Sequence, residues 1–208
     1  MTWDSFGLYL IAAIGLSLTP GPNGLLALTH GTRYGVRATT ATILGGGLGF
    51  LVLIALSLAG MGALLAASHT LFTVVKWVGG LYLVWLGIQL WRAPPMAATL
   101  LIDPTIETIK ASKLFRQGFL VAVSNPKGLI FFSAFLPQFM SPEAGFLTQL
   151  AVFGGTFVCV EILYEVMLAA TARRIAPVLS RHGRWFNRTT GATFIGMGAI
   201  LATGSRTS

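Results

Sequence analysis

Long apolar runs separated by short polar segments fill almost the whole chain. Six of these runs approach or exceed the roughly 20 residues that a membrane-spanning helix needs. They cover residues 6–29, 42–65, 73–91, 116–139, 149–172 and 185–204. The runs are too long and too uniformly apolar for the strands of a membrane β-barrel. The pattern therefore predicts an all-α integral membrane protein with six transmembrane helices.

Helix-breaking residues interrupt the first and fourth runs near their middles. The residues at these breaks are Thr19, Pro20, Gly21, Pro22 and Asn23 in the first run and Asn125, Pro126 and Lys127 in the fourth. Lipid cannot satisfy the backbone groups that a break frees, so such a break is expected to line a polar cavity. The half-helix that follows presents free N–H groups and a positive dipole end, which suit a carboxylate. The alternative for each break is a structural proline kink.

The two halves of the chain carry similar motifs in the same order. The matching pairs are TP at 19–20 with NP at 125–126, NGLL at 23–26 with KGLI at 127–130, GG at 46–47 with GG at 154–155, and GLYLVWLG at 80–87 with GATFIGMG at 191–198. Three spans per half place the copies in opposite orientations, which gives the inverted repeat of many secondary transporters. We expect one transmembrane domain over 1–208, with a first repeat at 1–93, a cytoplasmic linker at 94–115 and a second repeat at 116–208.

Basic residues are concentrated in alternate loops. Eleven of the 14 lysines and arginines lie in the loops after the first, third and fifth spans, and the other two loops hold none. The positive-inside rule makes the basic loops cytoplasmic and places both termini outside. This distribution explains the net charge of +8 better than a nucleic-acid partner does. A composition that is 54% hydrophobic and 10% charged also excludes a disordered chain.

Three ionisable residues lie within the predicted spans. Lys127 is near the middle of the fourth span. Burying a charge at this depth costs roughly several kcal/mol unless the charge faces a partner or a cavity. Glu161 and Glu165 share one face of the fifth span with Gly154 and Val158, and this face should point inward. Two acids this close in a low dielectric cannot both ionise cheaply, so at least one is expected to carry a proton. The alternatives are a structural ion pair between Glu161 and Lys127, and an assisting role for Glu165 nearer the cytoplasmic water.

No metal, cofactor or nucleotide site is indicated. The three histidines do not cluster with the single cysteine, Cys159, and the chain lacks Walker, G-x-S-x-G and H-E-x-x-H motifs. We therefore expect a protein that is not an enzyme and that uses ion gradients. Gly45 and Gly49 form a small-residue pair that favours close helix packing within the fold or, equally, a homodimer face.

Three segments resemble the lysine-exporter (LysE) superfamily, in particular its RhtB branch of homoserine and threonine exporters. They are LTPGPN at 18–23, KWVGGLYLVWLGIQLWR at 76–92 and NPKGLIFFSAFLPQF at 125–139. The resemblance implies a multi-pass protein of the bacterial inner membrane that exports amino acids or related metabolites against proton entry. It supports seven of the break residues and matches Glu161 to an acidic position, often Asp in the family. The seven are Pro20, Gly21, Pro22, Asn23, Asn125, Pro126 and Lys127. Glu165 matches no acidic position of the family, which leaves the substrate open.

Together these features predict a six-helix exporter of amino acids or close analogues that works by proton antiport. The half-helix that starts near Asn23, together with Lys127, would hold the substrate carboxylate. Glu161, with or without Glu165, would take the substrate ammonium or the exchanging proton. The alternatives are a passive channel, which needs a continuous polar lining, and a membrane-embedded enzyme or electron carrier, which needs a reactive constellation that the chain lacks.

Overall fold

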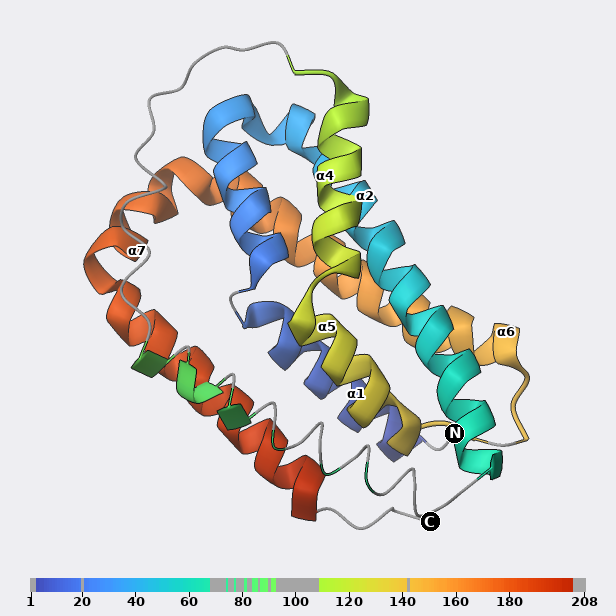
Figure 1. The fold of residues 1–208 in the computed structure, drawn as a ribbon. Helices are drawn as coiled ribbons and strands as arrows, with labels where there is room; N and C mark the ends of the chain where they lie inside the picture. The colour runs from blue at the N-terminus through green and yellow to red at the C-terminus, as the bar shows by residue number, and fades with distance from the viewer. Residues whose placement is uncertain are drawn as a thin grey trace.

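The structure is a computed structural model, and it describes residues 3–19, 21–67, 109–141 and 143–203 together with isolated helical positions between 74 and 92. Every regular element among these residues is a helix (Figure 1). The all-α prediction is confirmed for this part of the chain. Pro20, most of the predicted third span at 73–91 and residues 94–108 of the predicted linker lie outside the described residues.

The first predicted span consists of two helices separated by a break. Helix α1 (Trp3–Leu18) ends before the break, and α2 (Pro22–Ala67) begins after it. A proline at the first position of a helix removes no helical hydrogen bond, and its fixed φ suits the helix. The predicted break is therefore confirmed, and Pro22 is the residue that starts the second half-helix.

Helix α2 reverses its direction at Gly35, as Figure 1 shows. Gly35 has φ 78° and ψ 168°, a conformation that glycine adopts readily because it lacks a β-carbon. The limb before Gly35 completes the first span. The limb after it contains the predicted second span at 42–65.

The fourth predicted span is also broken. Helix α4 (Ala111–Val123) is followed by α5 (Pro126–Ile130), the π-helical turn η1 (Phe131–Phe135) and the 3-10 turn η2 (Leu136–Gln138). The axes before and after the break differ by 47°. Helix α4 begins five residues before the predicted start at 116. Its first turn is amphipathic and too polar to be predicted as membrane-buried, but it is helical in the structure.

The last helical run comprises α6 (Phe146–Gln149), the π-helical turn η3 (Leu150–Gly154) and α7 (Gly155–Thr203). The 49 residues of α7 would extend about 74 Å, more than twice the thickness of a bilayer core. The helix changes direction along its length in Figure 1. It contains most of the predicted fifth span at 149–172 and the described part of the sixth at 185–204.

Glycines bring α2 and α4 into direct backbone contact. A β-carbon at Gly45 would collide with the Phe115 carbonyl oxygen, and one at Gly49 would lie 2.7 Å from the Ala122 β-carbon. The small-residue pair is thus used for packing inside the fold. The face of α2 that carries Gly45 and Gly49, which was the alternative homodimer face, is covered by α4.

The outer faces of the helices are apolar. On α2, Leu44, Leu48, Val52 and Leu56 are exposed at four-residue spacing. Among the described residues, Pro22–Gly60 and Phe146–Ala172 are long and apolar enough to cross a membrane, and Ala111–Val123 with Lys127–Gln138 makes a third, bent span. Exposed apolar stripes on such helices are what a lipid environment requires. The count of six spans and the inverted repeat stay predictions.

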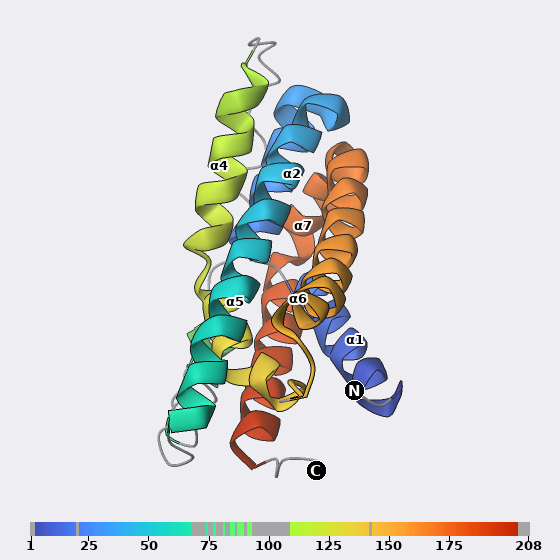
Figure 2. The ribbon, with the colours of Figure 1, turned by 90° about the vertical axis from the view of Figure 1, so that its right-hand side faces the viewer.

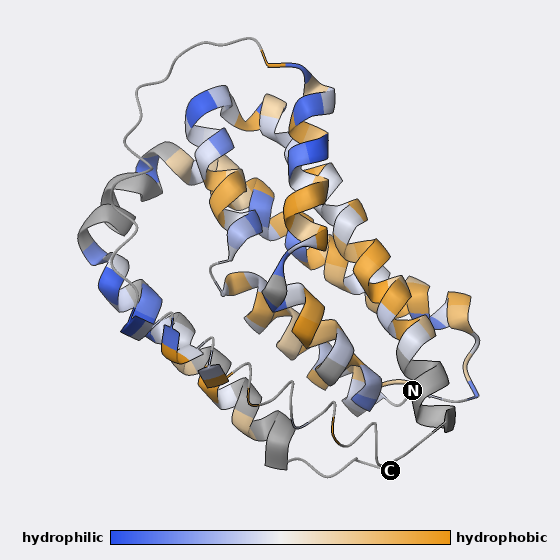
Figure 3. Cartoon of the chain, in the orientation of Figure 1, coloured by the Kyte–Doolittle hydropathy of each residue, from blue (hydrophilic) through white to orange (hydrophobic). Residues whose placement is uncertain are grey.

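The two ends of the molecule differ in polarity. The first turn of α1 and the last turn of α7 lie at one end, which we call the terminal end (Figures 1 and 2). The bend of α2 at Gly35 and the first turns of α4 lie at the other end and carry hydrophilic residues between apolar ones (Figure 3). We call this the basic end, because Arg33 and Arg37 flank the bend and Lys113 lies in the first turn of α4.

Candidate functional site

Buried polar side chains gather where the two helix breaks meet. Each is at most 5% exposed, and together they form what we call the central polar site: Ser17, Thr19, Asn23, Asn125, Lys127, Glu161 and Glu165. They come from the C-terminal end of α1, the start of α2, the N-terminal end of α5 and the first turns of α7. The structure therefore brings together the break residues and both acidic residues that the sequence singled out.

Two asparagine side chains join the breaks. Asn125 Nδ2 donates a hydrogen bond of 3.0 Å to Asn23 Oδ1, and Asn125 Oδ1 accepts one of 3.0 Å from the backbone N–H of Lys127. Asn125 thus caps the helix after its own break, as asparagine commonly does, and also holds the other break. On the first break, the Leu25 N–H bonds to the Gly21 carbonyl oxygen at 3.0 Å and closes the first turn of α2.

The Lys127 ammonium binds the broken end of the first span. It donates hydrogen bonds to the carbonyl oxygens of Leu16 at 2.8 Å and Thr19 at 3.0 Å. These carbonyls belong to the C-terminal end of α1, where orphan acceptors and the negative dipole end favour a cation. Gly21 leaves the space for it, since a β-carbon there would lie 3.1 Å from Lys127 Nζ. An ammonium has three N–H donors, so one is left over from these two bonds.

Glu161 faces this ammonium without a full set of hydrogen bonds. Its Oε2 is buried and has no hydrogen-bond partner among the described residues. The Ser17 hydroxyl lies beside its carboxylate but lacks the geometry of a hydrogen bond. Lys127 acts on Glu161 through its charge. The two hydrogen bonds of the ammonium go to α1, so a tight structural ion pair is not what holds Lys127 in place.

Glu165 is buried as deeply as Glu161, at 2% exposed. Its Oε1 also has no hydrogen-bond partner within the described part of the chain. The carboxylate lies near the start of α2, because a β-carbon at Gly46 would be 3.7 Å from Glu165 Oε2 and 3.0 Å from Asn23 Nδ2. Both acidic residues are therefore buried, and the choice between a direct and an assisting role for Glu165 stays open.

Ser17 is a member of the site that was not predicted from the sequence. The residue is 1% exposed and lies two turns beyond Tyr9 on the face of α1 that also buries Ala13. This spacing of four residues was a usable signal, because it marks the inward face of the helix. Tyr164 was also missed; its ring lies against Gly24, 3.3 Å from where a β-carbon would be.

The arrangement suits a small ligand that carries a positive group. Two buried carboxylate oxygens that have no partner in the described part of the chain can accept hydrogen bonds from an ammonium or bind a proton. Either occupant lowers the cost of burying them. The spare N–H of Lys127 can bind a carboxylate. Among the described residues, no group of three His, Cys, Asp or Glu side chains could hold a metal ion.

Comparison with known proteins places this chain in a family. The family model described as LysE type translocator matches residues 14–205, which is nearly the whole chain. The chain belongs to the LysE family. The resemblance seen in its sequence motifs is thereby confirmed. This LysE protein is a membrane transporter and not an enzyme.

Several relatives match the LysE protein over almost their full length. It is 33% identical over 204 residues to a homoserine/homoserine lactone efflux protein of Salmonella typhi, covering 97% of this chain and 98% of the relative. It is 37% identical over 202 residues to an uncharacterized membrane protein of Vibrio cholerae, covering 94% and 95%. A leucine efflux protein of Klebsiella pneumoniae is 28% identical over 201 residues, covering 94% and 93%. No solved structure matches the chain.

Proposed function

We propose that this LysE protein is a secondary-active exporter of amino acids or related small metabolites that takes up protons in exchange. The observation that carries the proposal is the pair of buried carboxylate oxygens on Glu161 and Glu165, which have no hydrogen-bond partner among the described residues and lie at the junction of the two helix breaks. Such groups are costly in a membrane protein unless they bind a cation during the transport cycle. The names of the relatives supply the substrate class.

The α-amino group is the part of the substrate that we assign to the two glutamates. Homoserine, homoserine lactone and leucine all carry this group, whereas the lactone has no free carboxylate. Recognition through the ammonium therefore serves every compound for which these relatives are named. Where a carboxylate is present, the third N–H of Lys127 and the start of α2 near Pro22 and Asn23 would bind it.

Proton antiport follows from competition for the same negative charge. A glutamate that binds the substrate ammonium must be ionised, and a glutamate that binds a proton cannot hold the ammonium. Substrate loading from the cytoplasm thus releases the proton there, and substrate release outside allows a new proton to bind. The exchange needs no nucleotide, in keeping with the absence of nucleotide-binding motifs in the sequence.

The basic end is the cytoplasmic end in this proposal, and both chain termini lie outside the bacterial inner membrane. The two three-span halves would rock against each other around the central polar site, as in other transporters with inverted repeats. A passive channel is less consistent with the packing. An apolar cluster that includes Leu16, Phe131, Phe132, Phe153 and Phe157 closes the side of the site toward the terminal end.

Purified protein in liposomes tests this function. Vesicles are loaded with homoserine or leucine, and efflux is measured with and without an imposed pH gradient. Antiport predicts that efflux against a concentration gradient occurs only when the pH gradient is present and that it stops when a protonophore is added. Efflux that runs only down the substrate gradient, whatever the pH, would identify a channel instead.

A further inference from the structure

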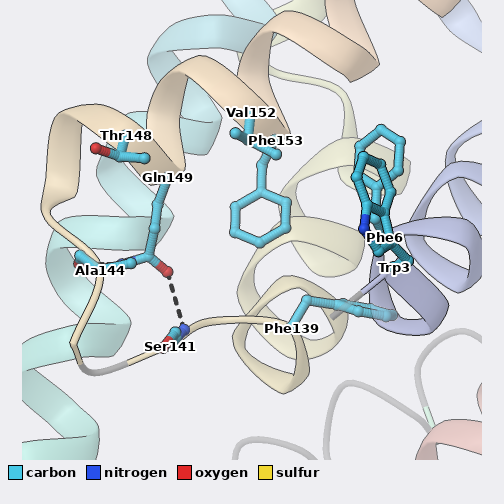
Figure 4. Close-up of a pocket in the computed structure, with 9 residues that line it drawn as sticks. All are labelled: Trp3, Phe6, Phe139, Ser141, Ala144, Thr148, Gln149, Val152 and Phe153. Atoms are coloured by element: carbon cyan, nitrogen blue, oxygen red, sulfur yellow. Dashed lines mark hydrogen bonds between the residues drawn. The ribbon is translucent and has the colours of Figure 1, made fainter. Parts of the chain in front are cut away.

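An open cavity lies at the terminal end of the molecule. Its volume is about 350 Å³, and its walls come from the start of α1, the segment after η2, α6 and η3. Aromatic rings and a few polar groups line it (Figure 4): Trp3, Phe6, Phe139, Ser141, Ala144, Thr148, Gln149, Val152 and Phe153. We call this cavity the vestibule. It lies at the end opposite to the basic loops, which is the external end in the proposed topology.

Helical faces connect the vestibule to the central polar site. On the last helical run, Gln149, Phe153, Phe157 and Glu161 follow each other at four-residue steps. Phe153 at the vestibule wall is therefore about 12 Å from Glu161 along the helix axis. On α1 the face runs from Phe6 past the buried Tyr9 and Ala13 to Ser17. The buried faces of α1 and of the last helical run therefore extend from the vestibule to the central polar site.

An outer aromatic layer closes the inner wall of the vestibule. The ring of Tyr9 packs edge-on against Phe153, with centroids 4.9 Å apart, and against Phe139, with centroids 5.6 Å apart. The Tyr9 hydroxyl donates a buried hydrogen bond of 2.8 Å to the Phe153 carbonyl oxygen. Phe153 lies in the π-helical turn η3, an irregularity that recurs at functional sites. Phe139 and Phe153 line the vestibule, while Tyr9 is fully buried behind them.

A second aromatic layer lies between the first layer and Glu161. The Phe157 ring packs against Phe132 with centroids 4.8 Å apart and against Phe50 with centroids 5.2 Å apart. Phe157 is one helical turn before Glu161. The described cluster toward the basic end is smaller in its side chains, with Ala27, Ile43 and Ala169 at its centre. Among the described residues, larger side chains therefore close the path to the terminal end than the path to the basic end.

We propose that these two aromatic layers are the gate on the substrate's exit path, that the vestibule is its outer mouth, and that the bond from Tyr9 to Phe153 holds the gate shut. The inference rests on the proposed export function. Substrate in the central polar site would leave by moving the first half of α1 away from η3. That motion breaks the hydrogen bond and separates the edge-on rings, while the backbone of each helix stays intact.

Accessibility of introduced cysteines in intact cells tests the gate without relying on transport. Cys159 is first replaced by Ser, and a single reporter is placed at Thr148→Cys in the vestibule or at Ser17→Cys in the central polar site. A membrane-impermeant thiol reagent should label Thr148→Cys quickly and Ser17→Cys slowly. Adding Tyr9→Phe should raise the labelling rate of Ser17→Cys by roughly three- to tenfold, the range that one buried hydrogen bond supports.

Matched variants keep the test decisive. Tyr34→Phe removes the same hydroxyl near the basic end and should leave labelling of Ser17→Cys unchanged. Phe139→Leu opens the outer layer by a second route and should act like Tyr9→Phe. An unchanged rate in both gate variants would overturn the gate, and so would fast labelling of Ser17→Cys in the otherwise unaltered protein. Labelling of Thr148→Cys only in inverted membranes would show that the vestibule is not the outer mouth.

The result is distinguishable from failure of the export proposal. A protein that labels as expected but moves no amino acid in liposomes would keep the gate and refute export. A protein that exports by proton exchange but labels equally in all variants would keep the function and refute the gate.

Discussion

Replacing Glu161 by Gln separates a structural role for this carboxylate from a role in proton coupling. The substitution keeps the shape of the side chain but removes its charge and its ability to take up a proton. Glu161 Oε2 has no hydrogen-bond partner in the described part of the chain, and the Lys127 ammonium is held by two α1 carbonyls. The change therefore breaks no hydrogen bond at this oxygen.

The structure gives the expected magnitude for stability. Breaking a tight buried ion pair costs about 3–5 kcal/mol. Loss of one longer-range attraction to Lys127 should cost only about 1 kcal/mol, similar to one net hydrogen bond. The Glu161→Gln protein should therefore purify as a single folded species, with a melting temperature within a few degrees of the original protein.

The effect on transport should be much larger. A pH difference of about 2 units stores about 2.7 kcal/mol for each exchanged proton, which supports substrate accumulation of about 100-fold. The amide of Glu161→Gln cannot carry the proton, so the ratio of substrate concentrations across the membrane should fall to about one. Substrate exchange between the two sides should continue at lower affinity, because Glu165 still offers a carboxylate. Liposomes with an imposed pH gradient measure accumulation, and counterflow without a gradient measures exchange.

Glu143→Gln is the matched control. Glu143 is an exposed carboxylate in the loop before α6, where it accepts a hydrogen bond from the Ser141 hydroxyl at 2.6 Å. Its replacement should leave pH-driven accumulation intact. A folded Glu161→Gln protein that still accumulates substrate to the original level would remove Glu161 from the coupling mechanism, and Glu165→Gln would become the next variant to measure.

Other expected outcomes concern the helix breaks, the packing and the topology. Lys127→Met leaves two α1 carbonyls without their donor and should lower the free energy of unfolding by about 2–3 kcal/mol, whereas Lys127→Arg should recover part of it in the same thermal unfolding assay. Gly118→Ala forces α4 away from the Thr42 carbonyl and should cost about 1–3 kcal/mol, whereas Gly60→Ala, with nothing within 4 Å, should cost nothing. Cysteines placed at Thr2 or Ser208 should react with an impermeant reagent in intact cells; reaction only after lysis would reverse the proposed topology.

Local chemistry made the helix breaks and the inward acidic face predictable from sequence. Proline removes a backbone donor and clashes with the preceding turn, and each of these breaks combines proline with glycine or asparagine, so the breaks near Pro22 and Pro126 could be predicted without knowledge of the fold. The spacing of three or four residues between Gly154, Val158, Glu161 and Glu165 likewise places these residues on one face of any helix. The structure buries Gly154, Glu161 and Glu165, as this spacing requires.

Contacts between distant segments could not be predicted in the same way. The Lys127 ammonium binds the Leu16 carbonyl, which is 111 residues away in the sequence. No local sequence pattern predicts that a lysine will bind main-chain acceptors. The Gly45–Gly49 pair was ambiguous for the same reason. Its spacing shows that a helix approaches closely, but only the fold shows that the approaching helix is α4 of the same chain. The π-helical turn η3 also has no marker in its sequence.

Some of the polar contacts that join the two halves of the chain involve groups that would bind the substrate. Lys127 belongs to the second half and holds the end of α1 in the first, and Asn125 holds Asn23 across the same junction. A ligand can shift a conformational equilibrium only if it interacts differently with the two states. An occupant that takes the third N–H of Lys127, or the charge of Glu161, changes the energy of this junction directly. Binding and relative movement of the halves therefore depend on one shared set of polar groups, which is the physical requirement for coupled exchange.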